Sequence, residues 1–429
     1  MPGQYPLAAA ALRDTCSMLD QTSRGKSALV LSGGGAFGAY EVGVIKALFD
    51  GCVPSTGGSR LEPDIFSGTS VGNFNAAVMA MNIGGGCASA ERLHHLWTHE
   101  IADNNDGRGN GVYRIRTMPT AYLDLARAGS PREQMHRLVD TARIFTEYAA
   151  KRGLRFIASD DDIFERIAGL VDISALFDVS EFYNLVRKSI SPETLRASGK
   201  VLRVTATGWN TGDAQEFDFP RMTDAETWSA IQASAAIPAV FPPVTLWGDI
   251  FIDGGVVMNT PIKPAVLAGA TELHVVSLNP DIPQLPPTHV DNTFDTFNRV
   301  YAMMLTTMIA EDIESARWIN EGIEALERID AGEELTTPLG RQFTRVAGQI
   351  YNKLKADGTL YRKLTIHRYY PKEALGGMAE MLNFRRMAID RLIDEGYKET
   401  LEHDCVLNNC VIPAVAPQRV TEIAEAAAA

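Results

Sequence analysis

Two apolar runs, each ending in glycine and each followed by a helical pattern, constrain the fold of this chain most strongly. The run Ser27–Ser32 (SALVLS) ends in Gly33–Gly35, and a helical pattern follows at once. A second run, Asp64–Ser67, enters Gly68 and leads into the small, apolar segment Val71–Met81. This strand–helix–strand–helix order predicts an α/β fold with a parallel sheet, because each helix returns the chain over the sheet before the next strand begins.

The strand pattern resumes beyond residue 200. Four further strands are predicted: Val201–Thr207, Gln215–Phe219, Ile250–Asp253 and Leu273–Leu278. Residues 85–200 contain amphipathic segments near 132–152, 161–171 and 181–197, which predict a helical insertion. The insertion is longer than an ordinary connection, so it is a candidate cap over a site, although surface helices would give the same pattern.

The chain divides into three predicted parts. Residues 1–26 are a weakly patterned N-terminal tail, residues 27–285 hold the predicted catalytic domain with the insertion at about 85–200, and residues 286–429 form a mostly helical C-terminal region. Helices are expected past residue 293 and again over roughly 377–395, where apolar residues recur at helical spacing.

Charge and composition exclude several classes of protein. The 429 residues carry a formal net charge of -13, which argues against nonspecific nucleic-acid binding. No apolar stretch approaches the roughly 18 residues of a spanning helix. The five cysteines are scattered, odd in number and without a CxxC pair, so neither a disulfide framework nor a zinc ribbon is expected. The N-terminus lacks the pattern of a signal peptide, and a reducing cytoplasm is the expected location.

The first chemical motif is Gly68-Thr69-Ser70-Val71-Gly72, a GxSxG pattern between a predicted strand and a predicted helix. A serine hydroxyl is a poor nucleophile and has to be presented on a sharp strand-to-helix turn, where bulky neighbours do not fit. Glycines two residues before and two after the serine meet that requirement. The motif therefore predicts Ser70 as a catalytic nucleophile, with Gly68 and Gly72 forming its elbow.

The second motif, Gly33-Gly34-Gly35-Ala36-Phe37-Gly38, closes a predicted strand and opens a helix. Backbone amides at such a helix start suit an oxyanion, so Gly33, Gly34, Gly35 and Ala36 are candidate donors of an oxyanion hole. The same spacing matches the GxGxxG fingerprint of dinucleotide sites, which expects an acid closing a second strand about 20 residues on. Asp50 and Glu62 bracket that distance, but neither closes a convincing strand. A glycine turn without any ligand is the third interpretation.

The third motif is Asp253-Gly254-Gly255, which closes the predicted strand Ile250–Asp253. Of the Asp-Gly pairs in the sequence, only this one stands at the C-terminal end of an apolar strand, the edge where α/β sheets bind their ligands. Partial desolvation would raise the pKa of the Asp253 carboxyl toward that of a useful base.

Histidine gives a weaker signal. His274, His289, His367 and His403 follow Ser70 in an order that a Ser-Asp-His triad allows, but none stands in a recognisable motif. His274 lies within an apolar strand, which is typical of a core residue. The group His94, His95 and His99 has no accompanying carboxylate pattern, so no metal site is expected there.

Four segments together resemble the patatin-like phospholipase family: GGGAFG at 33–38, GTSVG at 68–72, SAAIPAVFPP at 234–243 and DGGVVMNTP at 253–261. The resemblance covers roughly residues 27–280 and implies a three-layer α/β/α sandwich with a mostly parallel central sheet. It further implies a Ser–Asp dyad without histidine, with Ser70 as nucleophile, Asp253 as base and the run from Gly33 to Ala36 as oxyanion loop. Phe37 stands where the family commonly has Arg or Lys, and Asp-Gly-Gly replaces a frequent Asp-Gly-Ala.

The sequence thus predicts a serine hydrolase of lipid acyl esters that needs no cofactor and no metal. Three alternatives stay open: acyl transfer to an alcohol or lysolipid, a nucleotide-binding protein that uses the glycine loop, and an inactive protein that only binds lipid surfaces. The predicted partner is a lipid or ester substrate, with peripheral membrane contact allowed and nucleic acid excluded. The oligomeric state is not indicated by the sequence.

Overall fold

The computed structural model describes residues 25–102, 110–115, 177–238, 240–280, 293–330, 341–342, 345–349 and 362–413. The predicted tail up to residue 24 and the predicted insertion helices near 132–152 and 161–171 lie outside these ranges.

Within the described ranges, an eight-stranded sheet has the order β10-β9-β1-β2-β5-β8-β7, with β6 paired to β5 off this path. The strands are β1 (Lys26–Leu31), β2 (Ile65–Thr69), β5 (Val201–Gly208), β6 (Ala214–Glu216), β7 (Val244–Leu246), β8 (Asp249–Asp253), β9 (Ala270–Val276) and β10 (Thr365–Tyr369). The strands from β10 to β5 run parallel, whereas β6, β8 and β7 pair antiparallel. The predicted, mostly parallel sheet is therefore confirmed.

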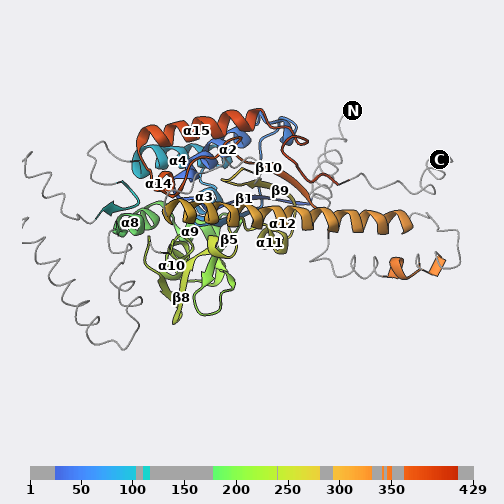
Figure 1. Ribbon diagram of the computed structural model, residues 1–429, viewed down its shortest axis with the longest axis horizontal. Coiled ribbons are helices and arrows are strands. Elements are labelled where there is room, and N and C mark those ends of the chain that lie inside the picture. The colour runs from blue at the N-terminus through green and yellow to red at the C-terminus, as the bar shows by residue number, and fades with distance from the viewer. Residues whose placement is uncertain are drawn as a thin grey trace, which may run out of the picture.

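Helices cover both faces of this sheet. Since successive strand residues point to opposite faces, Leu29 and Leu31 of β1 enter one hydrophobic core and Ala28 and Val30 enter the other. The helices of the first core are α2 (Gly38–Asp50), α3 (Val71–Ala80), α4 (Gly86–His95), α10 (Asp224–Ser234) and α15 (Arg386–Leu401). The second core is formed with α11 (Ile262–Leu267) and α12 (Thr293–Asp330). Figure 1 shows α15, α2 and α4 stacked on one side of the sheet, in agreement with the expected three-layer sandwich.

Shorter elements connect these layers. They are the single-turn helices η1 (Gly35–Phe37), η2 (Pro54–Thr56), η5 (Phe219–Arg221) and η6 (Gly254–Val256), the π-helical turn η3 (Leu96–Ile101), the small strands β3 (Arg114–Ile115) and β4 (Phe177–Asp178), and the helices α8 (Ser180–Ser189), α9 (Pro192–Ala197) and α14 (Met378–Met381). No described helix is both long enough and apolar enough to cross a lipid bilayer.

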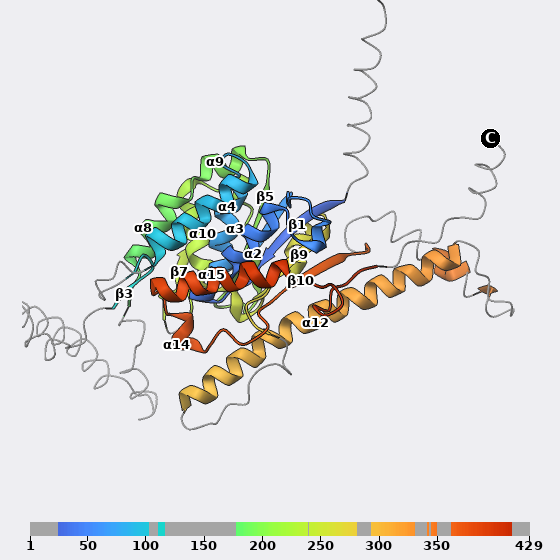
Figure 2. The ribbon, with the colours of Figure 1, turned by 90° about the horizontal axis from the view of Figure 1, so that it is seen from above.

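The C-terminal region is helical as expected, but one predicted helix is broken. α12 is a long helix that extends well past the sheet in Figure 2. The prediction of a single helix over 377–395 is wrong, because α14 ends at Met381 and α15 begins only at Arg386. The side chain of Asn383 accepts a hydrogen bond from the Arg385 amide at 3.2 Å, so it competes with the helical backbone at this point.

α15 connects the end of the described chain to its beginning. A Cβ atom on Gly43 of α2 would lie 2.1 Å from the carbonyl oxygen of Ile393, and one on Gly396 of α15 would lie 2.1 Å from that of Tyr40. The two helices therefore approach so closely that only glycine fits at both crossing points. β10 connects the C-terminal region to the central sheet a second time, because it pairs with β9. No strand was predicted for its sequence, Thr-Ile-His-Arg-Tyr.

Candidate active site

Ser70 occupies the turn between β2 and α3, at the carboxyl edge of the parallel strands. Its backbone has φ 54° and ψ -125°, a conformation that costs a non-glycine residue about 1–3 kcal/mol. The glycines on either side allow the turn to be this sharp. A Cβ atom on Gly68 would lie 2.5 Å from the carbonyl oxygen of Gly72, and one on Gly72 would lie 2.5 Å from that of Leu31. Both motif positions thus require glycine, because neighbouring backbone leaves no room for a Cβ atom there.

The strained turn is held by a second serine. The backbone amide of Ser70 donates a hydrogen bond to Ser234 Oγ at 3.0 Å. Ser234 Oγ in turn donates to the carbonyl oxygen of Thr205 at 2.6 Å, and the side chain is fully buried. Ser234 opens the motif at 234–243, but nothing in the sequence indicates a role for its side chain. Its position at the end of α10, facing the loop after β2, becomes visible only in three dimensions.

Strand register brings Asp253 to the same edge as Ser70. Thr69 pairs with Thr205 in the neighbouring strand β5, and the next residue of β5, Ala206, pairs with Asp253 of β8. The chain then turns over the end of β5, since a Cβ atom on Gly254 would lie 2.3 Å from the Thr205 carbonyl oxygen. Two residues that are far apart in sequence therefore stand on either side of a single strand.

The Asp253 carboxyl is buried and only half satisfied. Its Oδ1 accepts a hydrogen bond from the Gly255 amide at 2.7 Å, whereas Oδ2 has no complete hydrogen bond in the described part of the chain. Burial raises the pKa of Asp253 to about 6, against the lowering influence of the nearby Ser70 hydroxyl and the Gly255 amide. The carboxyl therefore has the proximity, the free oxygen and the raised pKa of a general base.

Asn259 fixes the glycine loop beside this pair. Its carbonyl oxygen accepts a hydrogen bond from the Gly33 amide at 3.1 Å, and its side-chain amide donates to the Gly33 carbonyl oxygen at 3.3 Å. A Cβ atom on Gly33 would lie 3.0 Å from the Cβ of Ser70, so the loop runs directly against the serine. Asn259 belongs to the motif that begins at Asp253, but nothing in the sequence indicates its contact with the glycine loop.

The predicted oxyanion donors differ in their availability. The Gly33 amide is engaged by Asn259, so it is not free to bind a substrate oxygen. The amides of Gly34, Gly35 and Ala36 stand at the start of η1 and have no acceptor among the described residues. The first amides of a helix have no partner within the helix, which makes them available to a bound anion. Gly35 has φ +57° and lines the same pocket as Ser70.

Among the described residues, the two acids considered for a dinucleotide site do not stand where its fingerprint requires one. α14 packs on the glycine turn, so that a Cβ atom on Gly35 would lie 2.4 Å from the Met381 carbonyl oxygen. The acidic residues considered for a ribose contact stand elsewhere: Asp50 ends α2 and accepts a hydrogen bond from Tyr397, and Glu62 precedes β2. Neither closes the second strand as the fingerprint requires.

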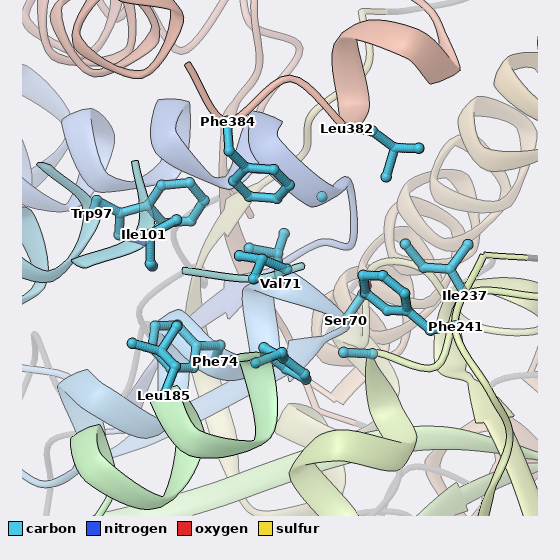
Figure 3. Close-up of a pocket in the computed structure, with 14 residues that line it drawn as sticks. Ser70, Val71, Phe74, Trp97, Ile101, Leu185, Ile237, Phe241, Leu382 and Phe384 are labelled. Carbon is cyan, nitrogen blue, oxygen red and sulfur yellow. The ribbon is translucent and has the colours of Figure 1, made fainter. Parts of the chain in front are cut away.

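An apolar pocket opens beside Ser70, with a volume of about 500 Å³ that includes its mouth. Figure 3 shows Ser70 next to Ile237 and Phe241, with Trp97, Ile101 and Phe384 across the pocket. α8 contributes Phe182 and Leu185, and the break between α14 and α15 contributes Leu382 and Phe384. Both the segment predicted as an insertion and the C-terminal region therefore supply walls of this pocket.

The histidines considered for a triad lie elsewhere. No histidine lines the pocket among the described residues. His274 is fully buried on β9 next to Tyr369, and His367 and His403 lie together near β10. His289 falls outside the described ranges. Among the described residues, none of the histidines considered for a triad therefore lies beside Ser70.

A family model of patatin-like phospholipases matches residues 29–266, more than half of the chain. The chain therefore belongs to the patatin-like phospholipase family, and the resemblance inferred from its motifs is confirmed.

Comparison with individual proteins gives more distant matches. Over 242 residues the chain is 24% identical to Triacylglycerol lipase 4 of Saccharomyces cerevisiae, covering 54% of this chain and 20% of the lipase. Over 310 residues it is 23% identical to Lysophospholipase NTE1 of Phaeosphaeria nodorum, covering 71% of this chain and 16% of that protein. The chain thus spans about a fifth or less of the length of these relatives. Among solved structures, VipD from Legionella pneumophila matches 88% of this chain and 66% of its own with a TM-score of 0.35 and 15% identity.

Proposed function

We propose that this chain is a lipid acyl hydrolase in which Ser70 and Asp253 act as a catalytic dyad. The observation that carries the proposal is the free Oδ2 of a buried carboxyl beside a serine held in a strained turn, at the wall of an apolar pocket. Relatives named as a triacylglycerol lipase and a lysophospholipase support an acyl ester of a lipid as the substrate.

In the first step Ser70 Oγ attacks the ester carbonyl carbon while its proton passes to the Asp253 carboxylate. The carbonyl oxygen gains negative charge as the tetrahedral intermediate forms. The amides of Gly34, Gly35 and Ala36 are the proposed donors to this oxyanion, and removing one such donor typically costs about 2.7–4 kcal/mol of barrier. When the intermediate collapses, the ester C–O bond breaks and Asp253 returns the proton to the leaving alcohol.

Water then hydrolyses the acyl-enzyme, with Asp253 again acting as the base. Asp253 takes a proton from the attacking water, the acid is released and Ser70 Oγ recovers its proton. The acyl chain of the substrate is expected to lie in the pocket lined by Val71, Phe74 and Phe241, because burying an alkyl chain gains about 0.8 kcal/mol per methylene group. Contact of the enzyme with a membrane surface stays a prediction.

The dyad is tested by Ser70→Ala against Ser89→Ala, a buried serine of α4 that does not line the pocket. Ser70→Ala should abolish hydrolysis of long-chain esters, whereas Ser89→Ala should retain it. A fluorophosphonate should add one phosphonyl group to the wild type and to Ser89→Ala, and intact-mass measurement should find none on Ser70→Ala. Full hydrolysis by a folded Ser70→Ala would end the proposal.

Hydrolysis and acyl transfer share the acyl-enzyme, so they are separated by their products. Incubation with a labelled phospholipid and excess lysolipid should release free fatty acid as the main product if water is the acceptor. A product mixture dominated by re-esterified lipid would assign the same dyad to transfer.

A further inference from the structure

Four side chains of types that bind metals converge near β10. β10 lies at the edge of the sheet away from β7 (Figure 2). His367 lies on β10, and His403, Cys405 and Cys410 follow α15. One potential ligand atom of each residue lies within 4.8 Å of all the others. None of the four lines the pocket beside Ser70.

Three sulfur–nitrogen distances within the cluster match those around a tetrahedral ion. Cys405 Sγ lies 3.5 Å from His367 Nδ1 and 3.5 Å from His403 Nε2, and Cys410 Sγ also lies 3.5 Å from His403 Nε2. Zinc bonds of about 2.3 Å to sulfur and about 2.0–2.1 Å to nitrogen place a sulfur and a nitrogen roughly 3.6 Å apart in a tetrahedron. The four side chains thus surround a space of the size that one ion needs.

We propose that His367, His403, Cys405 and Cys410 form a structural zinc site. Two imidazoles and two thiolates are a preferred donor set of this ion, and four protein ligands leave no position for water or substrate. The cysteines are separated by four residues, which falls within the usual spacing of paired zinc thiolates.

The backbone is arranged to present both cysteines to the same point. Asp404 Oδ1 accepts hydrogen bonds from the amides of Val406 and Leu407, at 2.8 and 3.0 Å, and so turns the chain after Cys405. The Cys410 amide donates to the Cys405 carbonyl oxygen at 2.9 Å, which closes the loop between the two cysteines. Their side chains therefore lie on one side of a short, internally bonded loop.

Neighbouring groups hold the cluster in place. The Arg368 amide donates to Cys410 Sγ at 3.3 Å, a contact that stabilises negative charge on a metal-bound sulfur. The His367 ring stacks on His274 at 5.0 Å, and the Tyr369 ring lies 4.7 Å from that of His403.

The site would clamp the C-terminal loop to the sheet. Val411 already forms a single bridge with Ile366 of β10, through backbone hydrogen bonds of 2.8 and 2.9 Å. An ion bound by one ligand of β10 and three ligands of the loop would connect the loop to β10 more strongly than this single β-bridge does. Because the loop follows α15, and α15 packs on α2, the ion would stabilise the attachment of the C-terminal region to the central sheet.

The first test measures metal in the full chain. Protein purified under reducing conditions, exposed to Zn²⁺ and desalted should retain about one zinc ion per chain. The Co²⁺-loaded protein should show the strong visible bands of tetrahedral coordination together with thiolate-to-cobalt charge transfer. Cys405→Ser and Cys410→Ser should lose the ion, whereas Cys52→Ser, at an exposed free cysteine, should keep it.

The second test uses only the wild-type chain, so it does not depend on the folding of a variant. Zinc should slow the alkylation of Cys405 and Cys410 by N-ethylmaleimide, while Cys52 should react at the same rate with and without zinc. A chelator should lower the melting temperature, and added Zn²⁺ should restore it.

Two results would overturn the proposal. The first is a reduced, folded protein that retains no zinc and whose two cysteines react equally fast in its presence. The second is retention of zinc by the Cys405→Ser and Cys410→Ser variants at the wild-type level. A disulfide between Cys405 and Cys410 in the reduced, zinc-exposed protein would count against the site as well.

Discussion

In the part of the chain that the structure describes, two groups of polar side chains at the central sheet are built differently. Near Ser70, the carboxyl of Asp253 keeps one oxygen without a complete hydrogen bond, and a pocket lies beside it. Near β10, the cluster formed by His367, His403, Cys405 and Cys410 directs its polar atoms at one another. The first group leaves space for an incoming molecule, whereas the second leaves space only for an ion.

The difference extends to backbone geometry. Ser70 is held at a positive φ by close backbone contacts, and amides of the adjacent glycine loop have no acceptor in the described ranges. In the cluster, turns and a β-bridge satisfy the backbone of the loop that carries the cysteines. A strained backbone and amides without an acceptor are typical of a catalytic site. Side-chain nitrogen and sulfur atoms that converge from a hydrogen-bonded loop are typical of a structural metal site.

Replacing Asp253, the proposed base, should have the largest effect on the site near Ser70. Asp253→Asn keeps the size of the side chain and an oxygen for the Gly255 amide, but it removes the proton acceptor. Hydrolysis should fall by a factor on the order of 10⁴, as for other members of concerted catalytic groups. Steady-state kinetics on a long-chain ester measures this. Asp249→Asn, an exposed carboxyl of the same strand, is the matched control and should behave as the wild type. Comparable activity in both variants would remove Asp253 from the mechanism.

The pH dependence should follow the raised pKa of Asp253. The carboxyl accepts a proton only when ionised, so kcat/KM should rise about tenfold per pH unit below about 6 and level off above it. The profile is measured by initial rates in buffers of constant ionic strength. A rate that does not change between pH 5 and 7 would contradict the assigned pKa of about 6.

The same shift predicts a stability cost of ionisation. Burial raises the pKa from 3.8 to about 6, so the folded state binds the proton more tightly than the unfolded state. The corresponding stability is complete below the unfolded-state pKa and is lost as the pH rises through about 6, a change on the order of 3 kcal/mol. Asp253→Asn, which stays neutral, should therefore melt at a higher temperature than the wild type at pH 7. Melting curves at several pH values should show this gap closing toward pH 4.

Removing the hydroxyl that holds the elbow should have a smaller effect. Ser234→Ala leaves the Ser70 amide buried without its acceptor, which costs about 1–3 kcal/mol of stability. A slight displacement of the nucleophile should lower kcat by about 10- to 100-fold with little change in KM. The control is Ser189→Ala, a buried serine whose Oγ has no partner in the described ranges. Equal kcat in the two variants would show that Ser234 does not position Ser70.

The two places also differ in how far the sequence predicts them. The elbow is local, so the GxSxG spacing indicated both the turn and its glycines. Asp253 ends a strand as predicted, but β8 runs antiparallel to β5, so the register between these two strands brings the carboxyl to Ser70, and the rule for parallel strands does not. Ser234 and Asn259 gave no comparable signal, because their roles depend on hydrogen bonds between segments far apart in sequence. The sequence also could not show that Asn259 engages the amide of Gly33.

β10 and the cluster beside it were not predicted for a related reason. A strand that contains His367, Arg368 and Tyr369 does not show the apolar alternation by which strands are recognised. All three side chains are nevertheless buried. The rings of His367 and Tyr369 contact the ring of His403 in the loop after α15, and Arg368 lies over the ring of Tyr370. Cys405 and Cys410 form no CxxC pair, and their partner His367 stands 38 residues before Cys405, so no short spacing in the sequence indicated the cluster.

Removing the proposed zinc ion should change kcat less than replacing Asp253 or Ser234 does. Because β2, β5 and β8 position Ser70 and Asp253, loss of zinc near β10 should leave kcat within about twofold. KM for a long-chain ester should rise instead, because the C-terminal region supplies the pocket walls Leu382 and Phe384. Kinetics of the chelated protein, below its lowered melting temperature, measures both parameters. If kcat falls in proportion to the lost zinc while the fold is retained, the ion acts on the reaction itself, and the division into a reacting place and a stabilising one is wrong.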